Sequence, residues 1–178
     1  MPRGYRKKGT AKPEKYGITF DSVDEVWFYE WCLDAQKSGL IKNFIYHPES
    51  VLVFPDYVER KKIVLRKCSY TPDFILEGIG DKLKPLFRES IDKRVWVDVK
   101  GAYVGLHGDL KAFVILTKAL WHLKKIFINK VIMQELCKNT FVPEEIKYTD
   151  KTKQLRTAFK GCKGLAEFLK NKSERKKK

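Results

Sequence analysis

Apolar residues recur at helical spacing in two long stretches of the chain. In residues 19–40, TFDSVDEVWFYEWCLDAQKSGL, apolar side chains three or four positions apart form one face, Ser22 is a good N-cap and Gly39 is placed to end the helix. Residues 108–125, GDLKAFVILTKALWHLKK, are apolar almost all round. This second pattern predicts a helix that is buried on every side.

Short runs rich in β-branched and aromatic residues lie between and after these two helices. They are bounded by His47-Pro48, by Pro55-Asp56 and by glycines, which are typical boundaries of strands. The predicted strands lie within residues 43–47, 50–54, 61–70, 73–78, 94–101 and 126–133. The order helix, strands, helix, strand predicts an α/β fold in which a mixed central β-sheet is flanked by helices.

Composition divides the chain into three parts. Residues 1–16 hold six cations among glycines and prolines and almost nothing to bury, which predicts a flexible basic arm. Residues 17–133 form the predicted core. In residues 134–178 the pattern is weaker, and we expect a C-terminal extension with a hairpin over residues 140–159 that turns near Thr149-Asp150, then a short helix and a basic tail.

Charge points to a polyanionic partner. Lysine and arginine number 37 against 22 acidic residues, a net charge of +15, and nucleic acid is the leading candidate. Candidate phosphate contacts are Arg6, Lys7, Lys8 and Lys111, each of which could equally be a solvated surface residue. No run approaches the roughly 20 apolar residues of a membrane span, and the N-terminus lacks the apolar stretch of a signal peptide, so we expect a soluble cytoplasmic protein.

Two of the predicted strands carry charged residues where packing alone would favour apolar ones. Asp73 lies in TPDFIL, and Asp98 and Lys100 lie in RVWVDVKG, where alternation places both of them on one face with Trp96. Buried charges need partners or a metal. Carboxylate oxygens suit Mg²⁺, with Mn²⁺ able to substitute, and such a metal beside a lysine suits phosphodiester hydrolysis. The cysteines and histidines, in contrast, lack zinc-ligand spacing.

These residues also carry a family resemblance. Pro72-Asp73, followed a strand later by Asp98-Val99-Lys100 and preceded by a helical Glu25, resembles the PD-(D/E)xK nuclease superfamily. YTPDFIL followed by acid-x-Lys-Gly is similar to phage endonucleases of the Holliday-junction resolvase type. The resemblance covers residues 17–133 and implies a restriction-endonuclease-like core. Acid-x-Lys occurs elsewhere in this lysine-rich chain, so the motif depends on its place in the predicted strands.

The resemblance implies a role for each of these residues. Asp73 and Asp98 would be metal ligands, Lys100 the catalytic lysine, and Glu25 would complete the acidic set. Glu25 also fits a capping box with Ser22, in which its side chain returns to the N-cap amide, so a purely structural role explains it as well.

Together these features predict a Mg²⁺-dependent DNA endonuclease that prefers branched or Holliday-junction DNA, in the host cytoplasm if it is phage-encoded. Symmetric cleavage of a junction needs two active sites, so we expect a homodimer. One alternative is a sequence-specific or transposase-associated nuclease of the same superfamily, for which only residues 80–93 offer a recognition segment between the two acidic strands. The other is a non-catalytic DNA-binding protein on a nuclease fold.

Overall fold

The computed structural model describes residues 13–101, 109–149 and 152–170. Four strands form its central sheet in the order β10-β9-β8-β3. β8 runs antiparallel to both β3 and β9, and β10 runs parallel to β9. The predicted α/β class with a mixed central sheet is therefore confirmed. The bounds are β3 (Asn43–Tyr46), β8 (Phe74–Glu77), β9 (Arg94–Val99) and β10 (Ile128–Val131).

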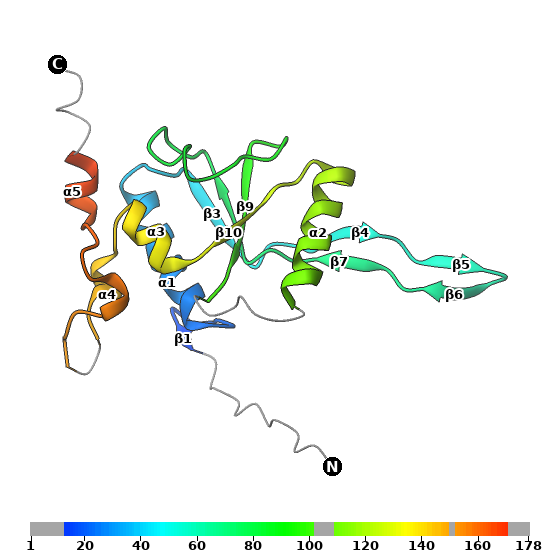
Figure 1. The fold of residues 1–178 in the computed structure, drawn as a ribbon, viewed down its shortest axis with the longest axis horizontal. Coiled ribbons are helices and arrows are strands. Elements are labelled where there is room, and N and C mark those ends of the chain that lie inside the picture. Colours follow the sequence, from blue (N-terminus) through cyan, green and yellow to red (C-terminus); the bar gives the residue numbers. More distant parts are fainter. Residues whose placement is uncertain (1–12, 102–108, 150–151, 171–178) are drawn as a thin grey trace, which may run out of the picture.

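Helices cover the two faces of this sheet, as Figure 1 shows for α1 (Val23–Lys37) and α2 (Asp109–Lys124). Ser22 caps α1 as predicted, because its hydroxyl accepts the backbone N–H of Glu25 at 3.2 Å. On the α1 side, one large core contains the inward residues of α1 and the alternate strand residues Phe74, Leu76, Val95, Val97 and Val99. On the α2 side, a smaller core contains Tyr70, Ile75, Trp96, Leu120 and Ile128.

The prediction that α2 is buried on every side was wrong. Leu120 is fully buried and Phe113 and Leu116 pack against the smaller core, but Ile115 is 65% exposed and Leu123 is 49% exposed. The apolar residues of α2 allow burial on every side of the helix, but they do not show which sides other elements cover. In the described structure no second layer covers the outer side of α2, so its remaining apolar residues face solvent.

A two-stranded arm projects from the body beyond α2 (Figure 1). β4 (Val51–Phe54) pairs antiparallel with β7 (Cys68–Tyr70), and further out β5 (Tyr57–Glu59) pairs antiparallel with β6 (Lys62–Leu65). We call residues 51–70 the β-arm. Strands were expected in this region from the sequence, but their projection away from the body was not.

The C-terminal part departs from its predicted hairpin. An isolated antiparallel bridge joins Tyr148 to Leu155, so the chain does turn near residue 149, but helical segments replace the expected strands. These are α4 (Glu144–Lys147) and a 3-10 helix, η1 (Thr157–Phe159). Pro143 at the N-cap of α4 favours the helical start, since proline has no N–H to donate to a strand partner.

Residues after position 132 also contribute to the main core. α3 (Met133–Asn139) begins where the last predicted strand was expected to end, and α5 (Leu165–Lys170) is the expected short helix. The buried side chains on the α1 side include Met133, Leu136, Cys137, Phe141, Val142, Ile146 and Phe159. The predicted core and the predicted extension therefore share one hydrophobic cluster.

The described part of the N-terminal segment is also folded onto the body. β1 (Glu14–Lys15) and β2 (Ile18–Thr19) form a small antiparallel pair. Lys15 forms an ion pair with the buried carboxylate of Glu30. Residues 1–12 lie outside the described residues, as do residues 171–178. No helix in the described ranges combines the length and the apolar composition needed to span a bilayer.

Candidate metal centre

The pairing of β8 with β9 brings the two predicted metal ligands together. The ladder pairs Phe74 with Val97, so the next position outward is Asp73 on one chain segment and Asp98 on the other. The backbone N–H of Asp73 donates to Val97 O at 3.1 Å. Asp73 Oδ2 accepts the backbone N–H of Val99 at 2.6 Å. The two carboxylates therefore lie opposite each other at the end of the ladder.

Asp98 is a buried carboxylate with one incompletely satisfied oxygen. It is 4% exposed, and its Oδ1 accepts the hydroxyl of Tyr70 at 2.9 Å. Its Oδ2 lies 2.5 Å from Lys100 Nζ, an ion pair that lacks the alignment of a hydrogen bond, so Oδ2 has no hydrogen-bond partner among the described residues. Lys100 therefore supplies the opposite charge that a buried anionic oxygen requires, while the hydrogen-bonding capacity of Oδ2 stays unused among the described residues.

Asp73 lies in an environment that opposes its ionisation. Burial, then repulsion by Asp98 and by Glu25, raises the pKa of Asp73 from 3.8 to about 7. The N–H of Val99 and the charge of Lys100 act in the opposite direction but do not offset these effects. A buried carboxyl group whose ionisation is opposed by a neighbouring carboxylate is typical of positions that hold a cation or exchange a proton.

Glu25 lies close enough to contribute to the pKa of Asp73, but its own oxygens are engaged locally. Oε1 accepts the Ser22 hydroxyl at 3.0 Å, and Oε2 accepts the hydroxyl of Tyr46 at 2.9 Å. Oε2 also accepts the backbone N–H of Asp21 at 3.2 Å, one residue before the N-cap amide that we predicted. The cap by Ser22 is confirmed, but the predicted return bond of Glu25 to the N-cap amide is replaced by the bond to Asp21. The role of Glu25 as a metal ligand stays a prediction.

His47 lies beside Glu25, a contact that the sequence analysis did not predict. Its Nε2 is 3.8 Å from Glu25 Oε2 and 3.7 Å from Asp21 Oδ2, and the ligand atoms of all three residues lie within 4.8 Å of one another. Asp21 and His47 are both exposed, so this group is a weaker candidate for metal binding than the buried pair Asp73 and Asp98.

The remaining predicted site residues are only partly described. Lys111 is an exposed residue in the first turn of α2, consistent with either a phosphate contact or a solvated lysine. Arg6, Lys7 and Lys8 lie outside the described residues. Lys100 packs its ammonium over the ring of Phe113 at 5.4 Å, so the first half of α2 borders the carboxylates.

Sequence reasoning missed one residue that contacts a carboxylate of the site and one that is the ladder partner of Asp98 in the sheet. Tyr70 donates to Asp98, and its only signal was its place just before Thr71-Pro72-Asp73. Lys130 pairs with Asp98 across the β9–β10 ladder and is exposed. Its signal was a lysine inside the mostly apolar run that follows α2. Both could have been found only by knowing which strands are neighbours.

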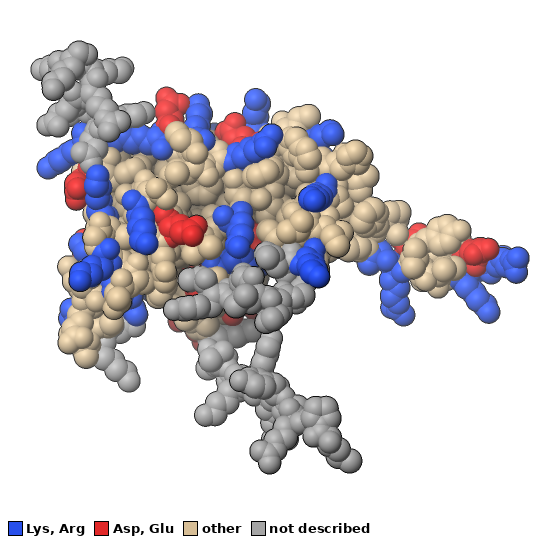
Figure 2. All heavy atoms as spheres, viewed as in Figure 1, with Lys and Arg blue, Asp and Glu red and all other residues tan. Residues whose placement is uncertain are grey.

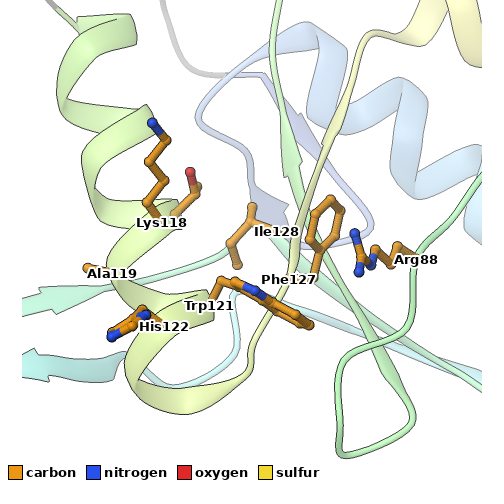
Figure 3. Close-up of a pocket in the computed structure, with 8 residues that line it drawn as sticks. Arg88, Lys118, Ala119, Trp121, His122, Phe127 and Ile128 are labelled. Carbon is orange, nitrogen blue, oxygen red and sulfur yellow. The ribbon is translucent and has the colours of Figure 1, made fainter.

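A pocket of about 680 Å³ lies at the far end of α2 from Lys100 and is not this site. Arg88 stacks over Trp121 and Phe127 at 5.0 and 4.9 Å in this region (Figure 3). The residues that line the pocket are Arg88, Thr117, Lys118, Ala119, Trp121, His122, Phe127 and Ile128, and they include no carboxylate. The pocket therefore offers no hard oxygen ligand from a side-chain acid, and the candidate metal centre is the carboxylate pair at the end of the β8–β9 ladder.

No protein-family model matches the chain, and searches of curated proteins and of solved structures found no significant match either. The interpretation of the site therefore rests on the residues of this chain.

We expect Tyr70→Phe to raise the Mg²⁺ concentration needed for half-maximal activity about tenfold, because residues that orient a metal ligand typically contribute 10–100-fold to affinity or activity. Burial and the charge of Asp98 raise the pKa of the Tyr70 hydroxyl, so it stays a donor. Titrating cleavage against Mg²⁺ tests this. Tyr148→Phe, in the C-terminal bridge, is the control. An unchanged Mg²⁺ requirement would mean that Tyr70 serves packing alone.

Proposed function

We propose that this protein is a Mg²⁺-dependent DNA endonuclease that hydrolyses phosphodiester bonds, with a preference for branched or Holliday-junction DNA. The observation that supports it most is the pair of opposed carboxylates, Asp73 and Asp98. One has a pKa raised to about 7, and the other has a buried oxygen without a hydrogen-bond partner among the described residues. A metal cation held by both carboxylates would favour the ionised form of Asp73 and would add to the charge that Lys100 already supplies at Asp98.

The residues fit a hard divalent cation. Asp73 and Asp98 offer carboxylate oxygens, and Mg²⁺ is commonly held by one or two carboxylates together with substrate phosphate and water. Mn²⁺ suits the same ligands. When bound, such an ion supplies charge neutralisation at the phosphate and makes a nearby water more acidic. The resemblance to the PD-(D/E)xK superfamily points to the same ligands.

The protein's own residues have separate parts in this scheme. Asp73 and Asp98 bind the cation, and the Tyr70 hydroxyl holds the Asp98 carboxylate in orientation. Lys100 Nζ, 2.5 Å from Asp98 and partly exposed, can swing toward the substrate to stabilise the charge that develops on the phosphate. Glu25 would complete the set if the local hydrogen bonds that now engage it rearrange.

The surface charge supports a polyanionic substrate. Lysine and arginine side chains are spread over the body and along the β-arm in Figure 2, and the full chain carries a net charge of +15. Charge of this kind binds phosphates without regard to sequence. A protein surface that contacts several duplexes of a junction at once adds up many weak contacts, and this favours binding of junctions over straight duplex. Cleavage of both strands of a junction would further require a homodimer.

The alternative of a sequence-specific nuclease has less support in residues 80–93. This segment is anchored to the body, with Leu83 fully buried and Phe87 and Ser90 nearly so. It therefore offers little free chain to read bases. For a non-catalytic DNA-binding protein the Asp98–Lys100 ion pair would be structural alone, whereas the enzyme hypothesis also accounts for the second carboxylate, Asp73, placed opposite it with a raised pKa.

We expect a labelled four-way junction to be cleaved about tenfold faster than linear duplex of the same sequence, at about 0.15 M salt with Mg²⁺, because several arms are held at once. Nicked and flapped DNA complete the substrate set, and EDTA is the control for metal dependence. Equal cleavage of junction and linear duplex would replace the resolvase hypothesis with a general nuclease. Cleavage confined to one short sequence would replace it with a site-specific one, and no cleavage of any DNA would refute the nuclease itself.

A further inference from the structure

The β-arm is attached directly to the candidate metal centre. Its inner strand β7 ends at Tyr70, the residue that donates to Asp98, and Asp73 follows three positions later. At its root, the hydroxyls of Ser50 and Thr71 lie 2.5 Å apart and tie the two ends of the arm together. The outer part of the arm is therefore joined through β7 to the residues of the site.

The tip of the β-arm places two cations in a backbone conformation that disfavours them. Glu59 pairs with Lys62, so Arg60 and Lys61 form a two-residue turn, and both have positive φ, 48° and 65°. Such turns favour Asn-Gly or similar pairs, because residues with larger side chains are strained there. Strain of this kind often marks a position chosen for its side chain rather than for its backbone.

The β-arm carries far more positive than negative charge. It holds five lysine and arginine residues and two acidic residues. None of the five cations forms a salt bridge with a described residue. One of the two acids, Asp56, accepts the backbone N–H of Lys67 at 2.6 Å. The cations, all exposed, are Arg60, Lys61, Lys62, Arg66 and Lys67. Lysine and arginine side chains gather at the end of the arm and along one side of it in Figure 2.

The shape of the β-arm suits a DNA groove. Two-stranded ribbons carry a strong right-handed twist, and register shifts in both ladders of the arm increase it. The major groove, about 12 Å wide, admits a ribbon of this kind. Val58 and Ile63, more than half exposed behind the tip, could there contact sugars and thymine methyl groups. Without such a partner, an isolated hairpin with exposed apolar residues is only marginally stable.

We propose that the β-arm is a DNA-binding ribbon that enters the major groove of the duplex beside the cleavage site, with Arg60 and Lys61 binding phosphates at its tip. The proposal rests on the proposed nuclease function. Lys61 lies nine positions before Tyr70, so at about 3.3 Å a residue the tip lies at most about 30 Å from Tyr70. At 3.4 Å per base pair, the arm reaches over at most about nine base pairs of duplex.

The decisive variant replaces the tip by the sequence that its turn prefers, Arg60→Asn with Lys61→Gly. This change removes two cations while relieving the backbone, so a loss of binding cannot be attributed to unfolding. The matched control removes two exposed lysines from the C-terminal part, Lys138→Asn with Lys163→Asn. Affinity for a labelled four-way junction is measured in EDTA over a range of salt concentrations, together with the melting temperature of each variant.

We expect the tip variant to bind the junction about tenfold more weakly at low salt. A plot of the logarithm of the binding constant against the logarithm of the salt concentration should become shallower by about 1.8, since each lost phosphate contact contributes about 0.9 to its slope. The melting temperature of the tip variant should be unchanged or higher, and the control should match the wild type in slope. Shortening the junction arms from about 14 to about five base pairs should weaken binding by the wild type more than binding by the tip variant, because the variant has already lost the two outermost cations.

Two results would overturn the proposal in different ways. If the wild type binds DNA and the tip variant keeps the same slope and affinity, the arm is not a DNA contact, although the nuclease can still be correct. A change in sedimentation without a change in slope would assign the arm instead to contacts between two copies of the chain. If the wild type binds no DNA at any salt concentration, the proposed function fails together with the ribbon.

Discussion

Asp73→Asn, Asp98→Asn and Lys100→Ala are each expected to slow DNA cleavage by two to four orders of magnitude. Loss of metal-based charge stabilisation or of the lysine should cost about 3–5 kcal/mol of transition-state stabilisation, and each 1.36 kcal/mol is a factor of ten in rate. The fold should survive in all three. Asparagine at 73 can still accept the N–H of Val99, and asparagine at 98 can still accept the hydroxyl of Tyr70.

Single-turnover cleavage of a labelled junction with saturating Mg²⁺ measures this loss, with circular dichroism to confirm folding. Glu145→Gln is the matched control, because Glu145-Ile-Lys147 has the same acid-x-Lys spacing but its acid is exposed on the short helix α4. It should cleave like the wild type. Near-wild-type cleavage by a folded Asp73, Asp98 or Lys100 variant would remove that residue from the site. DNA affinity in EDTA should not fall for the two acid variants, since they make the protein more basic.

The sheet and the positions of its acidic residues could be predicted because alternation along a strand is local. Phe74 and Val97 lie in the core beneath α1, and Ile75 and Trp96 lie in the core beneath α2, as period-two patterning requires. Once the faces are known, Asp98 and Lys100 must share the α2 side. The ladder then supplies the one fact that the sequence lacked, namely that Asp73 stands opposite Asp98.

Features that depend on neighbours distant in the sequence were beyond prediction. An apolar run does not reveal how many layers will cover it, so α2 was expected to be buried although Ile115 and Leu123 face solvent. The projection of the β-arm depends on β4 pairing with β7 rather than joining the central sheet. The contacts of Tyr70 with Asp98 and of His47 with Glu25 likewise join residues that only the fold brings together.

The metal-free protein is expected to lose stability as the pH rises from about 4 to 7, and Asp73→Asn should abolish much of this loss. Asp73 has a pKa of about 7 in the folded protein against 3.8 as its ordinary value. Between these values the folded state holds a proton that the unfolded chain has released, so folding becomes less favourable with rising pH. Three pKa units correspond to at most about 4 kcal/mol.

Melting temperatures of wild type and Asp73→Asn, measured in EDTA from pH 5 to pH 8, test this. The wild type should fall by about 5–10 °C relative to the variant over this range, because about 1 kcal/mol shifts the melting temperature of a domain of this size by roughly 2–4 °C. Mg²⁺ should restore most of the difference at pH 8 in the wild type alone, since a cation at the carboxylates favours the ionised form of Asp73. If the melting temperatures of the two proteins change with pH in the same way, Asp73 has an ordinary pKa in the folded protein. The raised pKa that supports metal binding at Asp73 and Asp98 would then be wrong.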